Sequence, residues 1–145
     1  MVDEADDVAR ARLRALAERW IVAGWRKGDT QALIAMHAPD FVDFGAPSGR
    51  APSREGFADG VRELYQAFPD FAASVSDLVV DESTGKVAIR WSAVGTHEGE
   101  YMGFAPTRRR VTFSGIEIIS VREGLIVERW GEWDGLDLQR QLAPG

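Results

Sequence analysis

The sequence VTFSGIEIISV at residues 111–121 decides how this chain of 145 residues is organised. Val111 and Phe113 alternate with Thr112 and Ser114, a period of two that is typical of a β-strand. Three further stretches with the composition of strands surround it, and they lie at 71–80, 86–98 and 125–133. Short turn sequences separate most of these stretches, which predicts an antiparallel meander over the second half of the chain.

The first half of the chain has helical periodicity instead. We expect helices at residues 6–27, 29–37 and 53–68, with a short strand at 41–44 between the last two. In the third helix, Phe57, Val61, Leu64 and Phe68 fall on one face and should be buried. Helices followed by a meander predict an α+β fold, with about three N-terminal helices packed on one concave face of a strongly bent antiparallel sheet.

Composition and charge exclude several classes of function. The length suits a single domain over residues 1–145. A net charge of −6 argues against a surface for nucleic acid or anionic membrane, and the lack of cysteine removes disulfides, thiolate zinc sites and cysteine nucleophiles. No apolar run approaches the roughly 20 residues that cross a bilayer. The acidic N-terminus is unlike a signal peptide, so we expect a cytoplasmic protein.

Several short motifs follow one another along the chain. Toward the C-terminus they are GTHEGE at 95–100, GFAPTRR at 103–109, GIE at 115–117, ERW at 128–130, WD at 133–134 and QRQL at 139–142. Upstream lie PDFVD at 39–43 and FPDF at 68–71. Each motif is weak alone, but the ordered set resembles the SnoaL-like polyketide cyclases, or ester cyclases, over most of the chain.

This resemblance implies both a fold and an activity. The fold is the cone-shaped, nuclear-transport-factor-2-like α+β fold, whose known cyclases work without metal or cofactor. It implies cofactor-free cyclisation or isomerisation of a small polyketide-like carbonyl compound by acid–base catalysis. Two alternatives stay open: a hydrolase or dehydratase of the same fold, or a non-catalytic dimer that binds a small molecule. We also expect a homodimer through the convex face of the sheet.

Glu117 is the first candidate catalytic residue. In the alternation of 111–121 it shares a face with Val111 and Phe113. A carboxylate among apolar neighbours should have a raised pKa, as a general acid or base near neutral pH requires. The alternation also allows the opposite arrangement, with Glu117 in solvent and Ile116 and Ile118 facing inward.

Arg129 is the expected partner of Glu117. In 125–133 it shares a face with Leu125, Val127, Gly131 and Trp133. If that face is concave, Arg129 can meet Glu117 on the neighbouring strand and orient a substrate carbonyl. An ordinary cross-strand ion pair fits the pattern equally well.

The chain departs from the family at two positions. Aligned through the shared motifs, the family's catalytic Asp falls on Gly131 and a pocket histidine falls on Glu117. Either the acid–base role has moved to Glu117, or cyclase activity has been lost. Asp43 is the second catalytic candidate, because it can form with Glu117 two carboxylates of unequal pKa. Its simpler role is to cap a turn at a strand end.

Four further residues are candidates for substrate binding: His97, Tyr101, Phe104 and Trp133. His97 matches a family motif and can donate to a ligand carbonyl, or it is a satisfied histidine at a strand end. Tyr101 and Phe104 lie in a segment that can close over a ligand. The two histidines are distant and lack carboxylates at metal spacing, which argues against a metal site. The serines lack a nucleophile elbow, which argues against triad chemistry.

Overall fold

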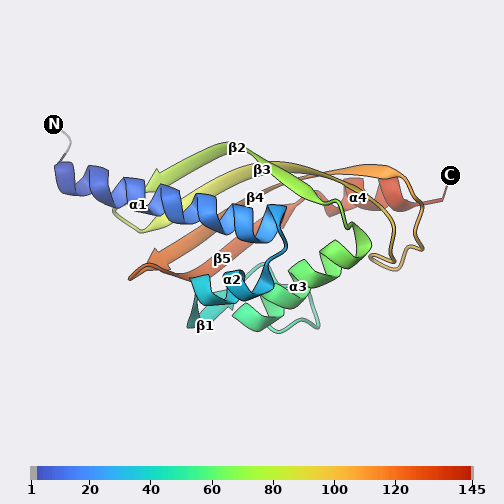
Figure 1. The fold of residues 1–145 in the computed structure, drawn as a ribbon, viewed down its shortest axis with the longest axis horizontal. Helices are drawn as coiled ribbons and strands as arrows, with labels where there is room; N and C mark the ends of the chain where they lie inside the picture. The colour runs from blue at the N-terminus through green and yellow to red at the C-terminus, as the bar shows by residue number, and fades with distance from the viewer. Residues whose placement is uncertain (1–2, 145) are drawn as a thin grey trace.

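The computed structural model describes residues 3–144. Its helices are α1 (Glu4–Ile21), which continues as the π-helical turn η1 (Val22–Arg26), α2 (Thr30–Met36), α3 (Arg54–Ala67) and α4 (Gly135–Leu142). Its strands are β1 (His37–Asp43), β2 (Ala72–Asp81), β3 (Lys86–Thr96), β4 (Arg110–Arg122) and β5 (Leu125–Trp133) (Figure 1). The α+β class and the order of helices before the meander are confirmed.

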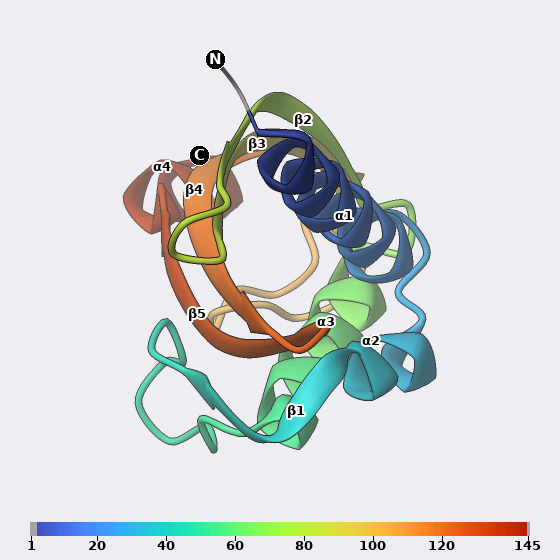
Figure 2. The ribbon, with the colours of Figure 1, turned by 90° about the vertical axis from the view of Figure 1, so that its left-hand side faces the viewer.

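The strands form one mixed sheet in the order β1-β5-β4-β3-β2. Strands β2 to β5 pair antiparallel, as predicted. Strand β1 adds a parallel edge beside β5, with Asp43 in register with Arg129. The sheet curves strongly, and α1 and α3 lie on its open, concave side (Figure 2).

Polar side chains determine where each α-helix begins. A carboxylate or hydroxyl at the N-cap accepts a hydrogen bond from a backbone N–H group that would otherwise lack a partner. The caps are Asp3, Asp29, Ser53 and Asp134, which bind the N–H groups of Ala5, Ala32, Gly56 and Asp137. The second and third helices, expected to start at residues 29 and 53, therefore begin directly after the caps at these two positions.

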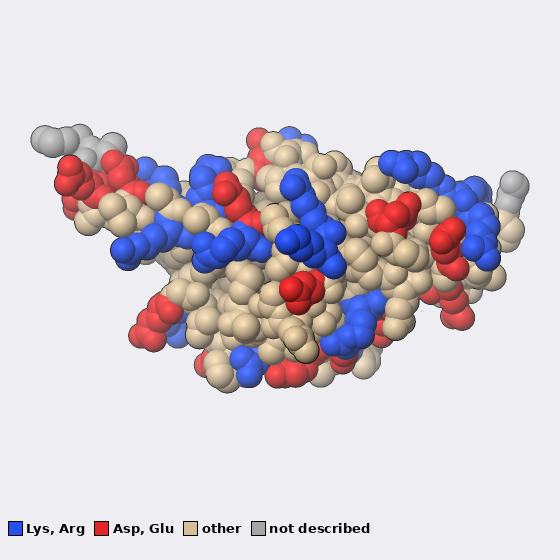
Figure 3. Space-filling model, in the orientation of Figure 1, with Lys and Arg blue, Asp and Glu red and all other residues tan. Residues whose placement is uncertain are grey.

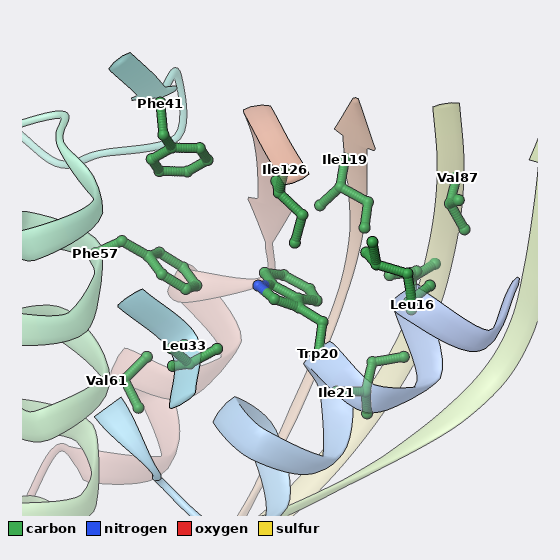
Figure 4. Packing of buried hydrophobic residues seen from close by; sticks show 12 residues of the cluster. Leu16, Trp20, Ile21, Leu33, Phe41, Phe57, Val61, Val87, Ile119 and Ile126 are labelled. Atoms are coloured by element: carbon green, nitrogen blue, oxygen red, sulfur yellow. The ribbon is translucent and has the colours of Figure 1, made fainter. Parts of the chain in front are cut away.

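The larger of the two hydrophobic clusters lies where α1, α2 and α3 pack against the sheet. Trp20 is fully buried there and stacks on Phe57, with ring centroids 5.8 Å apart (Figure 4). Phe57, Val61, Leu64 and Phe68 are all buried, as predicted from the periodicity of α3. Burial of such side chains stabilises the fold by about 1.5–3 kcal/mol each.

The faces of β4 agree with one of the two predicted arrangements. Val111, Phe113 and Glu117 are buried, whereas Ile116 is 51% exposed on the convex face. The prediction for the start of β5 is wrong, because Ile126 is buried there and not Leu125 or Val127. A bulge opposite Ser120 and Val121 shifts the register at this point, and such a shift exchanges the two faces of a strand.

Helix α4 was not expected from the sequence. It lies where β4 extends beyond the end of β5, and Gln141 takes the place of a neighbouring strand. The Gln141 side chain accepts from the N–H of Thr112 and donates to its carbonyl oxygen, both over 2.9 Å. Leu138 and Leu142 are buried in a second hydrophobic cluster with Phe113.

The surface carries charges of both signs. Acidic and basic side chains are interspersed on the face shown in Figure 3, which therefore has no broad positive field. Within residues 3–144, no helix is both long enough and apolar enough to cross a membrane.

Candidate functional site

A cavity of about 700 Å³ lies between α3 and the concave face of the sheet. Seven of its 21 lining residues are aromatic: Trp25, Phe57, Phe71, Trp91, Tyr101, Phe113 and Trp133. The charged side chains of Arg50, Glu63 and Glu100 also line it. Asp43 and Arg129 line it at one side. A more open groove of about 550 Å³ lies between α1 and α2, and it has no aromatic lining residue. The aromatic cavity is therefore the candidate site.

Arg129 holds two carboxylates in one buried ion cluster. Its Nε donates to Glu117 Oε1 over 2.6 Å, and its Nη1 donates to Asp43 Oδ1 over 2.9 Å. The side chains of Arg129, Asp43 and Glu117 are 13%, 5% and 2% exposed. The guanidinium carbon lies 5.0 Å from the centre of the Phe57 ring. We call this arrangement the Asp43–Arg129–Glu117 cluster.

The sheet register explains why the three side chains meet. Arg129 on β5 is the register partner of Asp43 on β1, and Glu117 on β4 is the partner of Gly131, two residues further along β5. The arginine side chain reaches both neighbours from the central position. Asp43 Oδ1 also accepts the N–H of Gly45 over 2.9 Å, so its predicted role in capping a turn holds as well.

The electrostatics of the cluster are unbalanced. With both carboxylates ionised, one guanidinium faces two negative charges. Burial raises the pKa of Glu117, against the opposing effect of Arg129, and the nearby Asp43 raises it further. Burial opposes the charge on Arg129, but Glu117 and Asp43 outweigh it, so the pKa of Arg129 is raised. The cluster therefore keeps its cation and can take up a proton at Glu117.

The structure separates the predicted site residues into two groups. Asp43, Arg129, Tyr101 and Trp133 line the cavity. Glu117 is not among the lining residues, because it binds the Nε end of Arg129 and is almost fully buried. The expectation that Glu117 itself faces the cavity is corrected: its contact with the cavity passes through the guanidinium.

His97 and Phe104 do not line the cavity either. His97 is fully buried, and its Nδ1 accepts from the N–H of Thr107 over 3.1 Å and lies 3.1 Å from the Thr107 hydroxyl. Its ring stacks on Phe68, and burial lowers its pKa. Phe104 exchanges two backbone hydrogen bonds with Tyr101. Both residues therefore support the wall that Tyr101 forms and do not themselves face a ligand.

Sequence reasoning missed several cavity residues, including Trp25, Arg50 and Trp91. Trp91 lies at the centre of β3, and across β4 it is in register with Gly115, which pairs in turn with Trp133. The two indoles therefore flank Gly115 on one wall. The alternation of Val87, Ile89 and Trp91 was the signal that could have placed Trp91 on the concave face. Arg50 lies in the loop before α3, where the sequence has no periodicity that could have indicated its position.

Metal ligands are not gathered anywhere in the described part of the chain. Within residues 3–144, no three His, Cys, Asp or Glu side chains come together as a metal site would require. The three charged groups of the cluster satisfy one another instead.

One family model matches most of this chain. The model of the SnoaL-like polyketide cyclase family matches residues 15–142. A search of curated proteins finds no significant match. Solved structures of the same fold match over nearly the whole chain.

Three of these structures come from Streptomyces. AclR of Streptomyces galilaeus, described as a candidate hydroxylase, is 28% identical with a TM-score of 0.81, covering 93% of this chain and 99% of AclR. TsrD of Streptomyces laurentii is 26% identical with a TM-score of 0.81, covering 99% and 98%. IdmH of Streptomyces antibioticus, a candidate polyketide cyclase, is 30% identical with a TM-score of 0.75, covering 90% and 97%. The expected nuclear-transport-factor-2-like cone is thereby confirmed.

Proposed function

The chain belongs to the SnoaL-like polyketide cyclase family, and on this basis we propose that it is a cofactor-free cyclase or isomerase of a small polyketide-like carbonyl compound. One observation carries the proposal: the Asp43–Arg129–Glu117 cluster stands at the wall of an aromatic cavity. A carboxylate beside a fixed cation is the pair of groups that enolate chemistry needs.

We assign the base role to Asp43. Its Oδ1 is occupied by Arg129 and Gly45, whereas no donor within residues 3–144 binds its Oδ2. Asp43 Oδ2 would remove a proton from the carbon next to a ligand carbonyl, and Arg129 would donate to the enolate oxygen. The enolate carbon then bonds to a second carbonyl carbon, whose oxygen takes the proton back from Asp43. The product is an isomer of the substrate, and no other reactant is consumed.

Glu117 acts through Arg129 in this scheme. It binds Nε on the side away from Asp43's contact at Nη1, so the guanidinium plane is fixed from two directions. Such fixed donors stabilise an oxyanion without the reorganisation that water would require. Glu117 is therefore a positioning residue, and Asp43 is the carboxylate that meets the ligand.

The cavity favours a flat, oxygen-bearing ligand. Trp91 and Trp133 flank Gly115 and offer planar contact surfaces. The indole N–H groups of Trp25 and Trp91 have no acceptor within the described residues. Buried donors usually find a partner, and ligand oxygens can supply one after a small side-chain movement. The volume is also within the range of about 300–1,000 Å³ for small-molecule sites.

Turnover of a panel of aryl polyketone esters, followed by chromatography and mass spectrometry, tests the proposal. Cyclisation or isomerisation leaves the mass unchanged, whereas hydrolysis adds one water and dehydration removes one. Asp43→Asn should lower kcat by about 10²–10⁴-fold. Asp59→Asn, on the exposed face of α3 and paired with Arg62, is the matched control and should keep full activity. Ligand binding without any turnover by the wild type would favour the non-catalytic alternative.

We further propose a homodimer through the convex face of the sheet. One cross-strand row on that face consists of Val79, Ala88, Ile118 and Trp130. Val79 is 63% exposed and Ile118 is 36% exposed, while Phe44 stacks on Trp130 with ring centroids 5.2 Å apart. A contiguous apolar surface of this kind is typical of a protein interface.

A further inference from the structure

The guanidinium of Arg129 occupies the space where a side chain at position 131 would stand. A Cβ on Gly131 would lie 2.6 Å from Arg129 Nη2 and 2.9 Å from Cζ. Contacts under 3.0 Å are essentially never seen for a real Cβ. Gly131 does not have a positive φ, so its backbone conformation would accept other residues. A side chain at 131 therefore fits only if the guanidinium shifts, and the constraint is one of space and not of backbone geometry.

A second glycine borders the same group. A Cβ on Gly45 would lie 2.9 Å from Arg129 Nη1 and 3.3 Å from Asp43 Oδ1. The guanidinium thus lies in a slot between the loop after β1 and the backbone of β5. Moving it out of the slot would break its bonds to Glu117 and Asp43. The arginine cannot give way to a side chain at 131 and keep both partners.

We propose that Gly131 is a positioning residue that decides which charged group stands at this wall of the cavity. With glycine at 131, the guanidinium of Arg129 occupies the wall; any side chain at 131 excludes it. The cavity of this chain therefore presents a hydrogen-bond donor and a positive charge at this wall.

The consequence for ligand recognition is specific. A guanidinium at this wall pairs with a carbonyl or enolate oxygen, whereas a carboxylate would pair with a proton-donating group. The inference concerns the same site as the proposed function but does not depend on its chemistry. The role of Gly131 can therefore be tested without a substrate. If this test fails, the proposed cyclase or isomerase function is unaffected, and the reverse also holds.

The first test is the titration of Glu117 in Gly131→Ala, followed by ¹³C NMR of its side-chain carboxyl. The charged groups around Glu117 are Arg129 and Asp43. If the new methyl group displaces the guanidinium, Glu117 loses its nearest cation and should titrate at higher pH than in the wild type. Gly135→Ala is the matched control, because a Cβ there lies at ordinary contact distance, 3.6 Å from the Trp133 ring. It should leave the titration unchanged.

The second test is a double-mutant cycle with Arg129→Gln, whose shorter side chain ends before position 131. Gly131→Ala should lower the urea midpoint, or abolish folding, when Arg129 is present. In the Arg129→Gln background the same change should leave the midpoint unaltered. Equal losses in both backgrounds would show an effect on the β5 backbone alone and overturn the proposal. An unchanged Glu117 titration in folded Gly131→Ala would overturn it too.

Discussion

Asp43 and Arg129 are register partners on neighbouring parallel strands, and Arg129 Nη1 donates to Asp43 Oδ1 over 2.9 Å. This pairing brings the carboxylate that ends β1 to the wall of the cavity. One of the two carboxylates that neutralise Arg129 therefore comes from β1, the strand at the edge of the sheet. Changes to either residue should therefore alter stability and chemistry together.

Removing the guanidinium should be the most damaging single change at the site. Arg129→Met leaves two carboxylates buried without a cation, and breaking a buried ion pair in this way costs about 3–5 kcal/mol. Urea unfolding at pH 7 measures the loss, which should shrink at lower pH as Glu117, whose pKa burial already raises, takes up a proton. Arg62→Met removes an exposed ion pair on α3 and should cost no more than about 1 kcal/mol. A loss equally small for Arg129→Met would contradict the burial argument.

Glu117→Gln should have the opposite effect on stability. Because the pKa of Glu117 is raised in the folded state, its favourable contribution is present below the unfolded value of 4.5 and is lost as pH rises through the folded value. At neutral pH the variant should be as stable as the wild type or more stable, and this advantage should disappear below pH 4.5. Urea unfolding at several pH values measures it. In turnover assays the fall in kcat should be smaller than for Asp43→Asn.

His37 should make the protein sensitive to acid. It is buried, and it accepts from Trp20 Nε1 at its Nε2 while its Nδ1 bonds the carbonyl oxygen of Leu33. Burial lowers the pKa of His37 to about 4 from 6.5. Its contribution to stability is therefore complete above pH 6.5 and is lost as pH falls toward 4, a change of about 3 kcal/mol. His37→Gln should have a flatter stability profile over this interval; parallel profiles would refute the assignment.

The convex row should determine the oligomeric state. Ile118→Glu places a charge in the centre of the apolar surface and should give monomers, as measured by sedimentation velocity at micromolar concentration. Leu136→Glu, on α4 and 59% exposed, is the control and should leave the assembly as it is. A wild-type protein that sediments as a monomer would dismiss the dimer proposal.

Chelation should have no effect on turnover. The proposed chemistry uses no group outside the Asp43–Arg129–Glu117 cluster, so activity should survive dialysis against EDTA. Lost activity that returns on addition of a divalent metal would overturn the cofactor-free mechanism.

Local patterns in the sequence predicted the central strands well. The alternation in β4 allowed Glu117 on either face, and the pattern of β5 allowed Arg129 to meet it if that face was concave. Their 2.6 Å contact agrees with the buried arrangement. The pairing of β1 with β5 was not predictable, because a parallel edge leaves no periodic signal in either strand. For the same reason the sequence could mark Asp43 as a candidate but could not identify Arg129 as its partner. His97 is buried by contacts with Phe68 and Thr107. Both residues are distant from His97 in the sequence, so no local pattern could predict its burial.

The parallel edge formed by β1 also bears on how the molecule folds. Asp43 and Arg129 are 86 residues apart, and the antiparallel strands β2 to β5 can pair through much shorter loops. Long loops close at a higher entropic cost, so contacts of this separation form late. The charged cluster should accordingly assemble in the last stage of folding. A chain truncated before β5 would retain most of the core-forming helices and strands. It would lack Arg129, so Asp43 would have no guanidinium to pair with.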